Sequence, residues 1–527
     1  MHAGHCIDAQ RLGTGGPRTG RMASPHRWHA EHTVDTNARG YAFAWRRIHG
    51  RSRRCVRRAS ASYRPATQAR TELSPPHRPT TRLRRLRPSR RMAVKRAERM
   101  KVLFICHGHP SIRPGGTEGY ALEVFNAFRQ RAGVDALFLA KGGQPMARSG
   151  NVHLGTFIAP VDDDPSEYLV FTDGYDYDWL NGSVRNLDFY TKHIHDFLVA
   201  VDPDVVHVQH TQSRGYPILR EIRNSVPDAA IVYTLHEFLP ICHNSGQMVR
   251  PETSELCTHA SPRRCHECFP AITPQDFFLR QRFIQAHLSL VDAFVAPSHF
   301  LLERYARWGI PRERLHFVEN GRALSGPPAP TASRANRNHF GFFGQLNPNK
   351  GVSVLLAAMR LLASGDSRIR LALHGANLEL QQREFQQFVT ASVDELADVT
   401  LHGAYQPEDM AQRMAPIDWV VVPSIWWENS PLVIQEAFFH GRPVICSDIG
   451  GMAEKVTDGV NGLHFRAGDA ASLASVMRRA ASSPTLWNRL RRGIKGVATI
   501  EDHVASLERI YQSILAVRRA EEVVHAG

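Results

Sequence analysis

Short apolar runs alternate with helical patterns along most of the chain. The first run, Val102–Cys106, has the length and composition of a strand buried on both faces of a parallel sheet. Longer stretches such as Leu187–Val199 and Phe277–Leu290 place apolar residues at helical spacing. This alternation predicts a parallel sheet covered by helices on both faces. The other strands expected in this part are Ala136–Ala140, Val205–Val208, Ile231–Leu235 and Ala293–Ala296.

A break rich in proline, alanine and serine, Ser325–Ser333, interrupts the pattern and is typical of a linker. After it the alternation restarts and continues to an amphipathic helix at His503–Val517. We therefore predict two α/β domains, residues 100–324 and 337–502, joined by a linker at 325–336 and followed by a C-terminal helix at 503–527. The strands expected in the second domain are Phe340–Gly344, Leu371–Gly375, Val399–Gly403, Trp419–Pro423 and Val444–Ser447.

The net charge of +15 is concentrated at the N-terminus. Residues 1–100 hold 24 lysines and arginines against 5 acidic residues, whereas the rest of the chain holds 41 against 45. We therefore expect no nucleic-acid binding by the folded domains. Residues 1–99 contain too little periodic apolar sequence to offset the entropy of ordering. Three interpretations stay open: a stretch upstream of a true start at Met92 or Met100, a disordered basic arm for nucleic acid or anionic lipid, or a transit peptide.

Two carboxylates, Glu428 and Glu436, flank a predicted helix start. Glu428 follows the strand Trp419–Pro423, at the carboxyl edge where open parallel sheets bind ligands. Ser430 suits the N-cap of the next helix and Pro431 suits its first position. The free N–H groups of such a helix start form an anion site. Glu436 lies inside the helix, roughly 10 Å from Glu428 at the rise of an α-helix.

This arrangement matches a nucleotide sugar, which has hydroxyls at both ends and a diphosphate between them. Carboxylates accept hydrogen bonds from hydroxyls. The same spacing also fits two ordinary solvated glutamates. The separation is too large for a retaining glycosidase pair, which stands about 5 Å apart, so a hydrolase of that type is disfavoured. Lys350 follows the strand Phe340–Gly344 and is either solvated or a phosphate partner.

The motifs together resemble a known family. The C-terminal set is Gly344 to Lys350-Gly351, Pro423-Ser424, Glu428-x7-Glu436, Gly441-x-Pro443, Gly450-Gly451-x-x-Glu454 and Asp458-Gly459-x-x-Gly462. The upstream set is Gly115-Gly116-Thr-Glu118, Pro203-Asp204 to His207, Thr234 to Glu237 and Val318 to Gly321. Over roughly residues 100–515 the chain is similar to the family-4 retaining glycosyltransferases (glycosyl transferases group 1), which have the GT-B fold of two Rossmann-like domains.

The resemblance implies a role for each matching residue. Glu436 would bind the nucleotide ribose, Glu428 the hydroxyls of the donor sugar, and Lys350 the diphosphate. The N–H groups of Ser430 and Leu432 would assist Lys350. Gly116 would approach the leaving phosphate from the first domain, and His236 would lie over the sugar, although a histidine after a strand also serves as a structural hydrogen-bonding group. The candidate catalytic residues are thus His236, Glu428 and Lys350, and the candidate donor-binding residues are Gly116, Gln345, Lys350, Glu428, Ser430, Leu432 and Glu436.

Gln345 stands where the family often has arginine. Glutamine is neutral, so charge neutralisation of the diphosphate would rest more on Lys350. With that lysine and the helix N–H groups in place, no metal is required for catalysis. The resemblance also implies a UDP-, GDP- or ADP-sugar donor, a saccharide or lipid-linked acceptor, and a final helix that crosses back to the first domain. By analogy we expect a cytoplasmic enzyme of cell-surface polysaccharide biosynthesis at the inner face of the membrane.

Two rival functions stay open. One is a sugar-nucleotide epimerase or phosphorylase of the same fold, and the other is a non-catalytic binding protein that uses the basic tail. The chain has no apolar run of about 20 residues, so we expect no transmembrane helix.

Four of the eight cysteines crowd together at Cys242, Cys257, Cys265 and Cys268. Their spacing ends in a Cys-x2-Cys pair like that of a zinc knuckle. A structural zinc site, free buried thiols and a disulfide are the three alternatives. Upstream, the acidic and aromatic insert Asp162–Tyr190 is expected to be a packed surface loop, with stacking on a sugar acceptor as the alternative.

Overall fold

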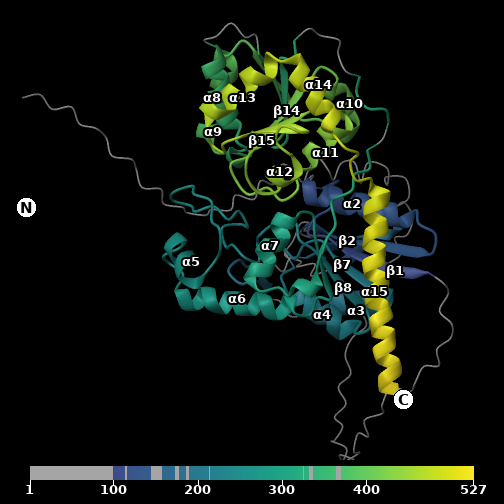
Figure 1. Ribbon diagram of the computed structural model, residues 1–527. Helices are drawn as coiled ribbons and strands as arrows, with labels where there is room; N and C mark the ends of the chain where they lie inside the picture. Colours follow the sequence, from purple (N-terminus) through teal and green to yellow (C-terminus); the bar gives the residue numbers. More distant parts are fainter. Residues whose placement is uncertain are drawn as a thin grey trace, which may run out of the picture. The chain divides into compact units, whose positions relative to one another are not determined.

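The computed structural model describes residues 99–112, 115–143, 157–172, 177–185, 189–212, 214–324, 326–330, 336–363 and 369–526. The interpretations of the basic tail fall on residues outside these ranges. Within the described residues lie two large sheets that are parallel throughout except for one strand pair, and a separate two-stranded ribbon (Figure 1). The α/β class and the GT-B-like architecture expected from the sequence are therefore confirmed.

The first sheet has eight strands in the order β10-β9-β8-β7-β1-β2-β4-β3, and only the β3–β4 pair is antiparallel. Helices follow most strands, as the alternation predicts. The strands are β1 (Met100–Ile105), β2 (Val134–Gly143), β3 (Phe157–Val161), β4 (Asp164–Phe171), β7 (Val205–Val208), β8 (Ala230–Thr234), β9 (Ala293–Ala296) and β10 (Leu315–Phe317). The helices are α2 (Gly116–Arg129), the π-helical turn η1 (Phe189–Ile194), α3 (His195–Val201), α4 (Pro217–Ser225), α5 (Pro262–Cys268), α6 (Pro274–Leu288), α7 (His299–Trp308) and the 3₁₀ turn η2 (Arg312–Arg314), and β5 (Tyr177–Asp178) pairs with β6 (Ser183–Val184) in a separate ribbon.

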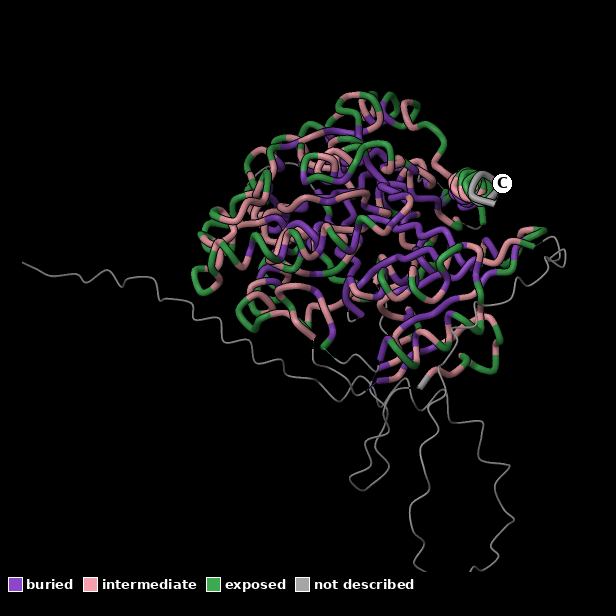
Figure 2. Tube along the Cα trace, turned by 90° about the horizontal axis from the view of Figure 1, so that it is seen from below, coloured by how far each residue is buried: buried purple, intermediate pink, exposed green. Residues whose placement is uncertain are grey.

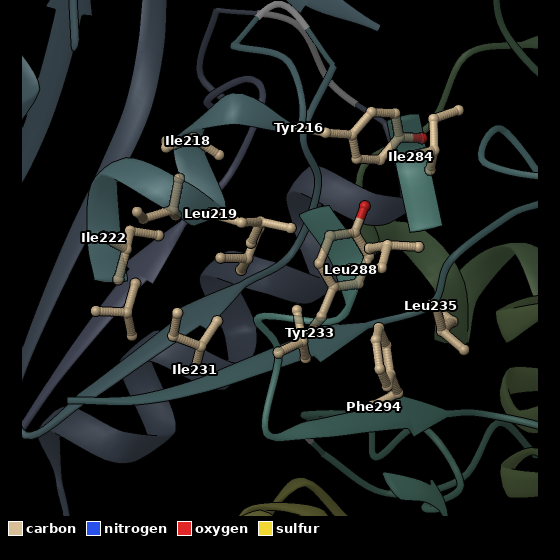
Figure 3. Packing of buried hydrophobic residues seen from close by; sticks show 14 of the residues in the cluster. Tyr216, Ile218, Leu219, Ile222, Ile231, Tyr233, Leu235, Ile284, Leu288 and Phe294 are labelled. Carbon is tan, nitrogen blue, oxygen red and sulfur yellow. The ribbon is translucent and has the colours of Figure 1, made fainter. Parts of the chain in front are cut away.

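Each strand of this sheet sends alternate side chains to opposite faces. In β1, Leu103 and Ile105 enter one core, while Val102 and Phe104 enter the other. Figure 3 shows part of the first core, where side chains of α4 and α6 pack with those of β8 and β9. A strand buried on both faces needs apolar residues at nearly every position, which explains the continuous apolar runs in the sequence.

The second sheet has six parallel strands in the order β13-β12-β11-β14-β15-β16. Trp419 and Val421 of β14 face one core, and Val420 and Val422 face the other. The strands are β11 (His339–Phe343), β12 (Arg370–His374), β13 (Val399–Gly403), β14 (Trp419–Val422), β15 (Val444–Ser447) and β16 (Gly462–Phe465). The helical elements are η3 (Pro348–Lys350), α8 (Val352–Ala363), α9 (Arg383–Glu395), η4 (Pro407–Asp409), α10 (Met410–Met414), α11 (Leu432–Phe439), α12 (Gly450–Lys455), α13 (Ala470–Ala481) and α14 (Pro484–Gly493).

The last helix, α15 (Ile500–Ala526), packs on the first sheet rather than the second (Figure 1). Its residues Val504, Leu507 and Tyr511 are buried in the same core as Phe104. The helix is longer at both ends than the predicted stretch His503–Val517. The proposed domain boundaries themselves remain predictions.

The insert Asp162–Tyr190 is not a surface loop throughout. Its residues Asp164–Phe171 form β4, which pairs with β2 and β3. The segment lacks a continuous apolar run because β4 lies next to the edge strand β3, and only Leu169 and Val170 of its residues are buried.

Buried residues concentrate along the strands and the inner faces of the helices (Figure 2). Among the described residues, no helix is both long enough and apolar enough to cross a bilayer.

Candidate functional site

Glu428 is the centre of a tight hydrogen-bond cluster at the carboxyl end of β14. Its side chain is 10 % exposed. Oε1 accepts hydrogen bonds from Lys350 Nζ at 2.7 Å, Ser424 Oγ at 2.7 Å and Trp426 Nε1 at 2.8 Å. Burial opposes ionisation, but Lys350 and the two neutral donors outweigh it and lower the pKa of Glu428 below its ordinary value. The carboxylate is therefore ionised at neutral pH.

Lys350 reaches this cluster because of the turn that follows β11. Asn347 caps the turn η3, its side chain accepting from the Lys350 N–H at 3.0 Å. Gly351 then has φ 72°, and a Cβ there would stand 1.8 Å from the carbonyl oxygen of Pro423. Only glycine allows the two strand ends to approach so closely. The close approach places the lysine beside Glu428.

The start of α11 differs in detail from the prediction. The N-cap is Pro431, and the helix begins at Leu432, one residue later than expected. Ser430 does not cap the helix, because its hydroxyl accepts a hydrogen bond from Lys455 Nζ at 3.0 Å. The N-cap prediction for Ser430 is therefore wrong, although the helix start does lie directly beyond Glu428. The Ser430 hydroxyl, which the local pattern predicts to cap α11, is instead bound by Lys455 from α12.

Glu436 is 9 % exposed and accepts a hydrogen bond from Arg322 Nη2 at 2.9 Å. The other terminal nitrogen of Arg322 contacts Glu123 Oε1 at 3.0 Å. Burial raises the pKa of Glu436 despite the opposing effect of Arg322. The arginine thus links a carboxylate of α11 to one of α2, and it lies in the segment that leads out of the first sheet.

His236 lies just beyond β8 and connects to the loop that carries Glu428. Its carbonyl oxygen accepts a hydrogen bond from the Asn429 side chain. Its ring Nε2 lies 3.0 Å from Gln209 Oε1, so Nε2 carries the proton and Nδ1 is an acceptor. Burial, together with His210 and His107, lowers the pKa of His236 well below its ordinary value. The ring is therefore neutral at physiological pH.

Gly116 and Gln345 stand apart from this cluster in the contacts of the described residues. Gly116 is the first residue of α2, and a Cβ added there would meet no atom within 4 Å. The space beside it is open to a ligand. Gln345 is exposed, and its amide oxygen lies 3.4 Å from Asn347 Nδ2.

Sequence reasoning missed Arg322 and Lys455. Lys455 is nearly buried, donates to Ser430 as described, and pairs with Glu319 Oε1 at 2.8 Å. Burial lowers the pKa of Lys455 despite that partner. Each residue has an acidic partner more than a hundred positions away, Glu436 for Arg322 and Glu319 for Lys455, so no local spacing reveals them. Glu319 supplies the carboxylate of this ion pair.

Glu454, the last residue of the Gly450-Gly451-x-x-Glu454 motif, contacts the start of α7. Its two carboxylate oxygens accept from the N–H groups of His299 and Phe300, at 2.8 and 2.7 Å, at the start of α7. The carboxylate thus complements the positive end of that helix. The backbone N–H of Gly451 donates a hydrogen bond to the Glu428 carbonyl oxygen at 2.7 Å. This bond holds the loop that carries Glu428 against the start of α12.

Two family models match the chain. "Glycosyltransferase Family 4" matches residues 114–325, and "Glycosyl transferases group 1" matches residues 337–483. Between them they cover every strand of the two large sheets except β1, and the residues of the candidate site.

The characterised relatives share about a quarter to a third of their aligned residues with this chain. The chain is 26% identical over 273 residues to lipopolysaccharide 1,2-N-acetylglucosaminetransferase of Salmonella typhimurium, covering 51% of this chain and 61% of that protein. It is 30% identical over 204 residues to D-inositol 3-phosphate glycosyltransferase of Nocardia farcinica, covering 36% and 44%. The chain thus spans less than two thirds of the length of these two relatives.

Solved structures share the fold. Sucrose-phosphate synthase from Thermosynechococcus elongatus superposes with a TM-score of 0.58 and 19% identity, covering 80% of this chain and all of that one. HepE of Anabaena, solved with UDP and glucose, superposes with a TM-score of 0.53 and 17% identity, covering 79% and 100%. With both halves matched and the architecture shared, the chain belongs to the family-4 glycosyltransferases with the GT-B fold.

Proposed function

We propose that this chain transfers a sugar from a nucleoside-diphosphate sugar to a saccharide or glycolipid acceptor, with retention of the anomeric configuration. The observation that carries the proposal is the meeting of Lys350 and Glu428 beside the start of α11. An ion pair there supplies a cation for phosphate and an ionised acceptor for sugar hydroxyls, next to free helix N–H groups.

The leaving group in this reaction is a nucleoside diphosphate, which gains negative charge as the glycosidic bond to the donor sugar breaks. Fixed cations and N–H groups that face this charge lower the barrier most when they need not reorganise. Lys350 is held by its cap and by Glu428, and Lys455 stands beside Ser430 at the same helix start. On donor binding, Lys350 would exchange part of its contact with Glu428 for the phosphate.

Glu428 would then bind the donor sugar. Its contacts with the described residues converge on Oε1, and Oε2 would accept from a sugar hydroxyl. Glu436 would accept from the ribose hydroxyls at the other end of the donor. The neutral ring of His236 would offer an acceptor at Nδ1 over the sugar, held in place through Gln209 and Asn429. Gly116 would leave room for the phosphate at the start of α2.

The relatives support this chemistry. The Anabaena protein was solved with UDP and glucose, and the catalytic domain of starch synthase IV from Arabidopsis thaliana, with a TM-score of 0.52, was solved bound to ADP and acarbose. UDP-, ADP- or GDP-sugars are therefore the donors to test. Synthesis of a cell-surface polysaccharide or glycolipid, at the inner face of the membrane, belongs to the same proposal and is suggested by the Salmonella relative.

A thermal-shift screen of UDP-, GDP- and ADP-sugars on the full chain tests donor binding. A ligand that binds only the folded state raises the melting temperature by mass action, by an amount equivalent to about 2.7 kcal/mol at a hundred times its dissociation constant. We expect one base to shift the temperature clearly and the others weakly. No shift with any of the three classes would contradict the proposal.

Turnover is measured as release of nucleoside diphosphate with a panel of saccharide and glycolipid acceptors. We expect release to depend on the acceptor, the product to keep the anomeric configuration, and added Mg²⁺ to leave the rate unchanged. Interconversion of the donor sugar without an acceptor would instead indicate an epimerase.

A further inference from the structure

The four clustered cysteines line one small cavity that lies apart from the Glu428 cluster. Its volume is about 20 Å³, the size of a single bound atom rather than a metabolite, and Cys242, Cys257, Cys265 and Cys268 all border it. All four are free thiols. Four thiols from a 27-residue stretch thus border one cavity without forming disulfides.

The segment that carries these cysteines has little else to hold it together. Its only helix, α5, buries none of its residues, and its hairpin is a single bridge between Val249 and Leu256 within the described residues. The backbone nevertheless brings the thiols together. Cys265 and Cys268 lie three residues apart on one face of α5, and the Cys257 N–H donates to the Met248 carbonyl at 2.7 Å. A segment that buries so little apolar surface of its own is typically stabilised by a disulfide or a structural metal ion.

We propose that Cys242, Cys257, Cys265 and Cys268 bind one structural Zn²⁺ that ties this segment together. Four thiolates are a common ligand set of closed, tetrahedral zinc sites, and soft sulfur ligands disfavour Mg²⁺ and Ca²⁺. Among the described residues, no three histidine, cysteine, aspartate or glutamate side chains are already arranged to coordinate a metal ion. The zinc ion would therefore draw the sulfur atoms together by rotation of the cysteine side chains.

Charge balance supports the site. Each thiol that binds zinc releases its proton to solvent, so a site with four cysteines releases four protons and carries a net charge of −2. Arg250 and Arg264 border the same cavity. The two arginines would offset the charge that the metal-bound thiolates acquire.

The zinc site would also stabilise the loop after β14, which carries Trp427 and Glu428. The Cys257 carbonyl oxygen accepts a hydrogen bond from Trp427 Nε1 at 3.0 Å, and Trp427 directly precedes Glu428. Arg304 stacks over the Trp427 ring, 4.9 Å from its centroid, and donates to the Thr258 carbonyl. Zinc that fixes Cys257 would thus fix one side of the Glu428 loop.

Metal content of the full chain tests this proposal without any reference to activity. The protein is expressed with zinc in the medium, purified without a metal-affinity column, dialysed, and analysed by mass spectrometry of its metals. We expect about one zinc per chain, and less than a tenth of that in the double variant C265S/C268S. The matched control C446S, which alters a buried cysteine of β15, keeps its zinc.

A second measurement covers the case in which the double variant does not fold. A mercurial thiol reagent is titrated into the wild-type protein while a zinc-sensitive dye reports free metal. We expect zinc release in step with the modification of about four thiols. Wild-type protein without zinc, zinc that survives full thiol modification, or a disulfide among these cysteines in the purified protein would each overturn the proposal.

Discussion

At the scale of single residues, the site depends on charges held in place by close partners. Sequence motifs include all three residues of the cluster at Lys350, Ser424 and Glu428, because a strand end and a helix start are local features of the sequence. They do not include Arg322 or Lys455, since their partners Glu436 and Glu319 lie far away in the sequence. Local spacing can predict which residues face a ligand edge, but not which distant charge will pair with them.

Replacing Lys350 with alanine should lower donor turnover by about 10²–10³-fold, because it removes a fixed cation that faces the charge of the leaving diphosphate. The measurement is nucleoside-diphosphate release at saturating donor. The control is Lys495→Ala, which removes an exposed lysine of the same domain and should leave turnover unchanged. Near-wild-type turnover in Lys350→Ala would refute the role assigned to this residue.

Donor binding should weaken on acidification because of Glu436. Burial raises its pKa above the ordinary value of 4.5, so it takes up a proton earlier than an exposed glutamate as the pH falls, and it then accepts less well from ribose hydroxyls. We expect the donor dissociation constant to rise as the pH falls through a window that begins above 4.5.

Glu436→Gln should bind donor about tenfold more weakly at neutral pH, equivalent to about 1.4 kcal/mol, and its binding should lose this acid sensitivity. The raised pKa means that the folded state binds the proton more tightly than the unfolded chain. Ionised Glu436 therefore costs stability as the pH rises through its folded-state pKa, and the variant should melt no lower than the wild type at pH 7. A pH dependence identical in both proteins would count against this assignment.

At the scale of elements, loops at strand ends hold the two halves of the site together. The loop after β14 contacts the first domain through Asn429 and Trp427, and it is anchored to α12 through Gly451. The strand and helix that flank this loop follow from apolar periodicity. The contacts of the loop do not, because indole and amide donors bind backbone carbonyls whose positions depend on the whole fold.

Trp427→Phe should weaken donor binding by about threefold to tenfold. The change removes the hydrogen bond to the Cys257 carbonyl, worth about 1 kcal/mol, and keeps a ring against Phe300. Isothermal titration with the donor measures the effect. Trp179→Phe, at a side chain that is 62 % exposed, is the control and should bind normally. Equal affinities in the two variants would show that the loop does not need this contact.

At the scale of the whole molecule, α15 joins the last part of the chain to the first sheet. Tyr511 is fully buried, and its hydroxyl lies 2.5 Å from His207 Nδ1, while His207 Nε2 lies 2.7 Å from Thr234 Oγ1. Tyr120 and His503 make a second such contact at 2.6 Å. The helix is thus held by buried polar pairs as well as by apolar packing.

Tyr511→Phe should lower the melting temperature by a few degrees. Loss of the hydroxyl leaves a buried histidine nitrogen without its partner, at a cost of about 1–3 kcal/mol. Burial lowers the pKa of His207 to about 3, so the ring cannot escape the penalty by taking up a proton at neutral pH. Differential scanning calorimetry measures the change. Tyr168→Phe, at a half-buried ring, is the control, and an equal loss in both would point to general packing instead.

The sequence by itself determined the two large sheets and most of their strands. It also determined that Lys350 and Glu428 each follow a strand and that Glu436 lies in the next helix. These features follow from apolar runs, glycine positions and helix starts, which act over a few residues. It did not reveal β4, whose half-exposed residues lack a continuous apolar pattern, or the true N-cap of α11.

Only the tertiary structure decided which distant residues meet. It brought Lys455 to Ser430, Arg322 to Glu436, α15 to the first sheet and four cysteines to one cavity. Such contacts join positions tens to hundreds of residues apart. They depend on how whole elements pack, because burial and charge pairing are settled by the final fold rather than by neighbouring sequence.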